Sequence, residues 1–222
     1  MPLIALLPYW LLVACFADGA CAADSPVQAD YLGSRDGKPP LKFHSVRLTL
    51  MNQQDKPVWL VLPYWGDKPL PEKGVFPNKN WKDQPFGGKK FDGVGGSAVE
   101  VLMYGGDGFK AFRLPAKGKL ELDGYTIEAD RDIAPIVVIE AQELKVNGKT
   151  PLEKWLPYAT TSGEKVKVGE HELNTDWKNL DWDPKRFRSR DDYPKEKVEE
   201  VKAEGIRCWT VKFQQKAEKK AP

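Results

Sequence analysis

The sequence is short of the side chains that bind metals through nitrogen and sulfur. Its 222 residues include two histidines and three cysteines. His171 stands between Glu170 and Glu172, and strand alternation would place both acids on the opposite face from the imidazole, so a metal site would need a second segment. The sequence therefore predicts no set of metal ligands.

An excess of positive charge is also missing. Lys and Arg number 34 against 32 Asp and Glu, which leaves a formal net charge of +2. Proteins that track phosphate backbones carry a marked basic excess or a basic stripe. The densest basic cluster, residues 184–190, is followed directly by Asp191 and Asp192, which cancel much of its field. We expect no nucleic-acid partner.

Motifs for nucleophilic catalysis and for nucleotide binding are missing or misplaced. The sequence has no Gly-x-Ser-x-Gly elbow. Residues 93–98, "GVGGSA", have the glycine spacing of a dinucleotide loop, but a β pattern follows where a helix would have to begin. Acidic residues are abundant, yet a sequence does not show their separation in space. We expect a protein without catalytic residues.

An apolar run opens the chain but is too short to span a bilayer. Residues 2–17 fall below the roughly 20 residues that a membrane helix needs, and Pro8 interrupts them. Their length and position are typical of the hydrophobic region of a signal peptide. We therefore expect an exported protein, located in the periplasm, in the cell envelope or outside the cell.

Two processing sites follow this run, and the sequence leaves both open. Residues 20–22, "ACA", have the small-x-small form of a signal-peptidase site, which makes residues 1–22 a signal peptide. Residues 12–15, "LVAC", resemble the bacterial lipobox, which implies a lipoprotein signal that ends before Cys15 and acyl chains on that cysteine. Contact with a membrane would then occur only through the lipid anchor. Cleavage at the first site leaves Cys208 as the only thiol, and we expect it to be buried on a strand.

The rest of the chain alternates short apolar runs with turn residues. Residues 57–65 are apolar on both faces, which predicts a central, fully covered strand. Residues 119–128, "KLELDGYTIE", predict a hairpin with a two-residue turn at Asp123 and Gly124. Residues 194–205 have an early proline, early acids and a final glycine, which predict a helix.

The fold class that these patterns predict is mainly β: a single antiparallel β-sandwich-like domain with long loops and one short C-terminal helix. The domain covers residues 42–214. A polar linker, residues 23–41, precedes it, and a charged tail, residues 215–222, follows it. No repeat of fixed period is visible, which argues against a propeller or a solenoid.

Tryptophan is the unusual residue type in this sequence. Trp59 and Trp209 fall on expected strands, whereas four others fall among loop residues, where a large apolar ring needs a pocket or a reason to be exposed. Flat aromatic surfaces beside hydrogen-bonding side chains suit sugar rings. The alternative is that these rings cover the ends of the sandwich. The candidate ligand-binding residues are Trp65, Trp81, Trp177 and Trp182.

The function that these features indicate is that of an exported, non-catalytic β-sandwich protein that binds a ligand or has a structural role, with a glycan or an envelope protein as partner. Two alternatives stay open: a secreted carbohydrate-active hydrolase that uses a carboxylate pair, and a lipid-anchored protein–protein interaction module. We expect no cofactor. Asp176, Asp181 and Asp183 offer oxygen ligands for Ca²⁺, but their spacing is not that of a helix-loop-helix calcium site, and a solvated loop is expected instead.

Overall fold

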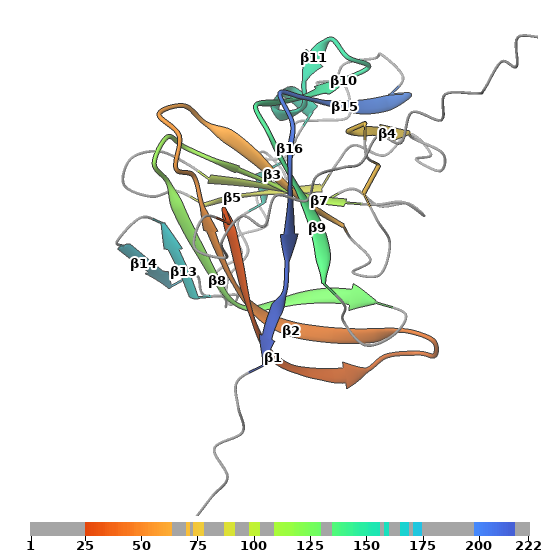
Figure 1. The fold of residues 1–222 in the computed structure, drawn as a ribbon, viewed down its shortest axis with the longest axis vertical. Coiled ribbons are helices and arrows are strands. Elements are labelled where there is room, and N and C mark those ends of the chain that lie inside the picture. Colours follow the sequence, from red (N-terminus) through yellow and green to blue (C-terminus); the bar gives the residue numbers. More distant parts are fainter. Residues whose placement is uncertain are drawn as a thin grey trace, which may run out of the picture.

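The chain folds into packed β-sheets, as Figure 1 shows for the computed structural model of this protein. This confirms the expected mainly β, sandwich-like fold. No helix in the part of the chain that the structure describes is both long and apolar enough to cross a membrane. The structure describes residues 25–63, 70–71, 73–77, 87–91, 98–102, 109–129, 135–155, 158–159, 165–168, 171–174 and 198–215.

A six-stranded sheet forms one side of the molecule. Its long strands alternate buried and more exposed side chains, the pattern of a sheet with one face on a core. Neighbouring strands run antiparallel, except that the last strand runs parallel to β1. In spatial order the strands are β14 (His171–Asn174), β13 (Lys165–Val168), β8 (Lys119–Ala129), β2 (Lys42–Met51), β1 (Val27–Asp36) and β17 (Phe213–Gln215).

A seven-stranded sheet and a four-stranded sheet complete the fold. The larger one contains β12 (Tyr158–Ala159), β5 (Gly87–Phe91), β6 (Ala98–Leu102), β7 (Phe109–Leu114), β3 (Val58–Pro63), β9 (Ile136–Ala141) and β16 (Arg207–Val211). The smaller one contains β11 (Thr150–Pro151), β10 (Glu143–Val146), β15 (Glu200–Glu204) and β4 (Val75–Pro77). A short 3₁₀ helix, η2 (Leu152–Trp155), follows β11.

Two hydrophobic cores lie on opposite faces of the seven-stranded sheet. The first fills the space between this sheet and the six-stranded sheet. The second lies where the four-stranded sheet packs against the other face. Leu60 and Leu62 of β3 belong to the first core, and Trp59 and Val61 belong to the second. All six side chains of β3 are therefore buried, which confirms the predicted central strand for residues 58–63. Residues 64 and 65 lie outside the described residues.

The C-terminal part of the described chain is a strand where the sequence predicted a helix. Val201 and Ala203 of β15 are buried, and Lys202 between them is exposed, which is the period of a strand. Both edges of β15 are paired, one with β10 and the other with β4. Sheet pairing thus overrides the local helix signals. The helix prediction is wrong for residues 200–204, and residues 194–197 lie outside the described residues.

The predicted hairpin at residues 119–128 is also wrong, because β8 runs straight through it. Leu122 pairs with Leu48 and Tyr125 pairs with Val46, so two residues of β8 face the single residue Arg47 of β2. This arrangement is a β-bulge. Gly124 has a φ of +74°, a conformation that glycine adopts without strain. An Asp-Gly pair therefore serves a bulge here rather than a turn.

Strand β1 lies inside the segment that the sequence predicted to be a polar linker. Val27 and Ala29 are buried in the first core, and β1 pairs with β2 along its length. The linker prediction is therefore wrong for residues 27–36, because a strand with one wet face needs few apolar side chains. Residues 1–24, which include both predicted processing sites and Cys15, lie outside the described residues.

Candidate binding hollow on the six-stranded sheet

The four tryptophans predicted to bind a ligand, Trp65, Trp81, Trp177 and Trp182, lie outside the described residues. The structure therefore does not bring them together or separate them. The two tryptophans predicted to lie on strands do so: Trp59 is buried on β3, and Trp209 is half-buried on β16. Cys208 is exposed on β16, which corrects the prediction that it is buried. It lies on the face of β16 opposite to Trp209.

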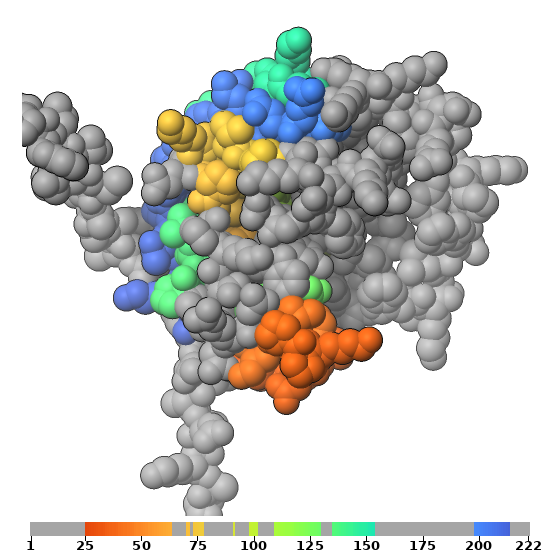
Figure 2. Space-filling view, turned by 90° about the vertical axis from the view of Figure 1, so that its right-hand side faces the viewer, coloured from red at the N-terminus to blue at the C-terminus, as the bar shows by residue number. Residues whose placement is uncertain are grey.

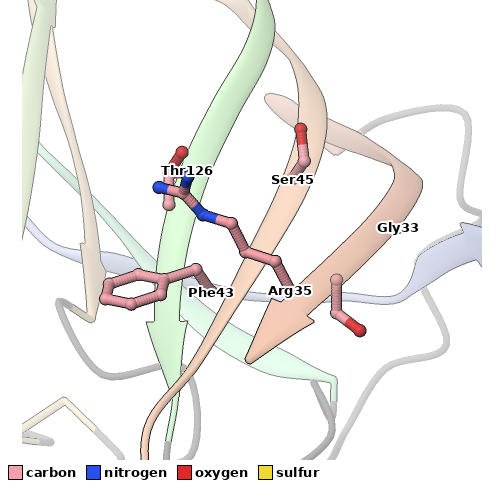
Figure 3. Close-up of a pocket in the computed structure, with 6 residues that line it drawn as sticks. Gly33, Arg35, Phe43, Ser45 and Thr126 are labelled. Carbon is pink, nitrogen blue, oxygen red and sulfur yellow. The ribbon is translucent and has the colours of Figure 1, made fainter. Parts of the chain in front are cut away.

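The outer face of the six-stranded sheet carries a shallow hollow of about 210 Å³ near the turn that joins β1 to β2. Figure 3 shows its residues on three neighbouring strands. Figures 1 and 2 show that this hairpin, in orange, lies at the opposite end of the molecule from the four-stranded sheet. The hollow is lined by Gly33, Ser34, Arg35, Phe43, Ser45 and Thr126.

The Phe43 ring and the Arg35 guanidinium group are the side-chain groups of the hollow that could bind a ligand. The Arg35 guanidinium carbon lies 5.3 Å from the centroid of the Phe43 ring, within the range of a cation–π contact. Figure 3 shows the Arg35 side chain running from β1 across β2 toward Thr126 on β8. Phe43 is half-buried and Arg35 is exposed. The hollow therefore offers an apolar surface, a fixed positive charge and hydroxyl groups side by side.

A β-bulge in β1 places Arg35 on this face. Tyr31 pairs with Val46 but Gly33 pairs with Ser45, so β1 has one extra residue, Leu32, at this point. Without it, the alternation that buries Val27 and Ala29 would continue and turn Arg35 inward. With it, Arg35 pairs with Phe43, and directly paired residues share a face.

A buried polar group lies on the inner side of the sheet behind the hollow. The hydroxyl of Tyr125 donates a 2.8 Å hydrogen bond to Oε1 of Glu100 on β6. Nζ of Lys110 on β7 donates a 2.7 Å hydrogen bond to the carbonyl oxygen of Thr126, and it lies 4.5 Å from the centroid of the Tyr125 ring. We call Glu100, Lys110 and Tyr125 the inter-sheet polar cluster. It joins the two large sheets next to a residue that lines the hollow.

His44 extends this polar region along β2. It is buried, and its Nδ1 lies 3.4 Å from the hydroxyl of Tyr31 on β1. Their rings are 5.8 Å apart. Because His44 stands between Phe43 and Ser45 on the strand, it faces the core while its neighbours face the hollow.

A second buried carboxylate, that of Glu140 on β9, binds the edge strand β16. Arg207 Nη2 donates to Oε1 at 2.9 Å, and Trp209 Nε1 donates to Oε2 at 3.0 Å. Gln54, in the connection between β2 and β3, also donates to Oε1. A buried charge is tolerated when it has this many donors. We assign Glu140 a structural role, since it ties three segments together.

The sequence carries a signal for two of these buried charged residues, Glu100 and Lys110. Glu100 stands between Val99 and Val101, and Lys110 stands between Phe109 and Ala111, so each is a single charge within an apolar run. Opposite charges on neighbouring buried strands suggest a pair. Among the residues that the structure describes, no group of three or more His, Cys, Asp or Glu side chains is placed to hold a metal ion.

Comparison with protein-family models, with curated proteins and with solved structures finds no match to this chain.

Proposed function

We propose that this protein is exported and binds glycan without catalysing its turnover, with the hollow on the six-stranded sheet as one contact surface. The observation that carries the proposal is the convergence of the Phe43 ring, the Arg35 guanidinium and the hydroxyl side chains of the hollow. A sugar ring has apolar C–H faces and a polar edge. An aromatic surface beside hydrogen-bonding groups matches both.

The size of the hollow supports recognition of one ring of a longer chain. Pockets for drug-sized ligands measure roughly 300–1,000 Å³, and this hollow measures about 210 Å³. It is partly open to solvent, so a polymer could cross it without inserting a chain end. The proposal includes the predicted loop tryptophans, Trp65, Trp81, Trp177 and Trp182, which would extend this binding surface.

Retention on insoluble polysaccharides tests the proposal. Phe43→Ala should lose retention, whereas Phe43→Tyr should keep it, because tyrosine preserves the ring. Trp81→Ala and Trp177→Ala should weaken retention without lowering the melting temperature. Thr49→Ala is a matched control, since Thr49 lies on the same face of β2 outside the hollow. Retention that is unchanged in Phe43→Ala and in both tryptophan variants would contradict the proposal.

Incubating the purified protein with the same polysaccharides distinguishes the hydrolase alternative from simple binding. Release of reducing ends from the polysaccharide by the purified protein, abolished by a single change of Asp or Glu, would favour a hydrolase. A stoichiometric protein partner from envelope extract, with no retention on any glycan, would favour the protein–protein interaction module. Glycan binding without turnover is the result that we expect.

A further inference from the structure

The guanidinium group of Arg35, which carries the positive charge of the hollow, forms no ion pair with an acidic residue in the part of the chain that the structure describes. Arg47, two residues beyond Ser45 on the same face of β2, donates to Asp123 at 2.9 Å and is thereby neutralised. Arg35 makes no such ion pair within the described residues. The charge of Arg35 is therefore not neutralised by an ion pair within the described residues, although the carboxylate of Glu128 lies on the same outer face, directly opposite Phe43 in the strand pairing.

The Phe43 ring restricts the arginine side chain. A guanidinium group held near an aromatic face loses less freedom on binding than a long side chain moving in solvent. Its planar fork matches the two oxygens of a carboxylate, and a bidentate pair of this kind is among the strong charge-assisted hydrogen bonds. Ser45 and Thr126, which pair with each other and share the outer face with Arg35, add neutral hydroxyl groups beside it. The donors thus suit one anionic group attached to a hydroxylated ring.

We infer that the hollow selects a carboxylate-bearing sugar, a hexuronic acid residue within an acidic polysaccharide, and that Arg35 determines this specificity. The inference rests on the proposed glycan binding and names its ligand class. The sugar carboxylate would accept hydrogen bonds from Arg35, and an apolar face of the ring would lie on Phe43. A neutral sugar would leave the guanidinium without a counter-charge.

Binding of polygalacturonate and of its fully methyl-esterified form tests the inference, because esterification keeps the sugar backbone and removes the charge. Affinity measured by calorimetry should be at least about tenfold higher for the acid form in the wild-type protein, which corresponds to ~1.4 kcal/mol. Arg35→Gln should remove that preference, and Arg35→Lys should restore only part of it, because an ammonium group is not bidentate. Lys38→Gln is the matched control: it removes the same charge from the same hairpin, at an exposed residue outside the hollow.

The outcomes distinguish this inference from the proposed function. Equal affinity for both polymers, unchanged in Arg35→Gln, would overturn the acidic specificity and leave glycan binding in place. An equal loss in Lys38→Gln and Arg35→Gln would show diffuse attraction by net charge and would overturn the role of Arg35. Failure to bind these two and any other polysaccharide would overturn both proposals. A loss confined to the Arg35 variants and to the acid form is the result expected.

Discussion

The hydroxyl of Tyr125 on β8 and the carboxylate of Glu100 on β6 meet across the two large sheets at 2.8 Å. Both residues are buried, and the Tyr125 ring also packs edge-on against Phe112, at a centroid distance of 5.7 Å. Most of this interface is apolar and therefore non-directional. The hydrogen bond adds a directional contact that favours one alignment of the sheets.

Tyr125→Phe should lower the free energy of unfolding by about 1–3 kcal/mol, since it removes a donor from a buried carboxylate. Chemical denaturation followed by tryptophan fluorescence measures the change. Tyr31→Phe is the control, because the Tyr31 hydroxyl is 3.4 Å from His44 and lies at the edge of the core. Equal stability of Tyr125→Phe and the wild-type protein would show that this hydrogen bond contributes nothing net.

Gly33→Ala should destabilise the bulge that orients Arg35. Gly33 has a φ of +143°, which residues with a Cβ atom rarely adopt. The cost should be about 1–3 kcal/mol, and binding at the hollow should weaken with it. Ser34→Ala, at the next residue, should change stability by less than about 0.5 kcal/mol. A Gly33→Ala protein as stable as Ser34→Ala would mean that the bulge tolerates a side chain.

The ion pair between Lys145 and Glu204 should make stability depend on pH. Lys145 Nζ lies 2.7 Å from Glu204 Oε2, and this hydrogen bond lowers the pKa of Glu204 and raises the pKa of Lys145. Because the pKa of Glu204 is lower in the folded state than in the unfolded state, its carboxylate stabilises the fold at pH values above its unfolded-state pKa of about 4.3. This stabilisation is lost as the pH falls through the folded-state pKa. Because the pKa of Lys145 is higher in the folded state, its ammonium group stabilises the fold at pH values below its unfolded-state pKa of about 10.4. This stabilisation is lost as the pH rises through the folded-state pKa.

Glu204→Gln should therefore be less stable than the wild-type protein near pH 7, and the difference should shrink on acidification to pH 3. Urea denaturation at pH 7, 5 and 3 measures it. The effect will be small, because both side chains are partly exposed. Glu200→Gln on the same strand is the control, since its carboxylate makes no ion pair in the described part of the chain. A difference that stays constant with pH would exclude this pair as the cause.

The central layer of the fold was predictable from the sequence because its signal is local. Residues 57–65 are apolar on both faces, and only a strand covered on both sides needs that composition. Strand β1 was not predictable in the same way. Its inward side chains are Val27, Ala29 and the partly buried Tyr31, and its other residues are mostly polar apart from the exposed Leu32, so its composition resembles that of a linker until its pairing with β2 is known.

The candidate site depends on two β-bulges, one in β8 and one in β1, and only the pairing of these strands with β2 reveals them. Asp123 and Gly124 have the residue types of a hairpin turn, and only the continuous pairing of β8 with β2 shows that they form a bulge. The extra residue Leu32 reverses the orientation of Arg35, and the neighbouring Gly33 marks a bulge only once residues 27–36 are known to form a strand. The contact between Arg35 and Phe43 could therefore not be predicted from the sequence, although the sequence contains both residues.

The most direct test of glycan binding at the hollow is an NMR titration of the ¹⁵N-labelled chain beginning at Ala23 with oligogalacturonate. Glycan binding at the hollow predicts saturable shifts at the amides of Gly33, Arg35, Phe43, Ser45 and Thr126, with β10 and β15 at the opposite end unaffected. Shifts that map elsewhere, or no shifts with acidic and neutral oligosaccharides alike, would contradict it.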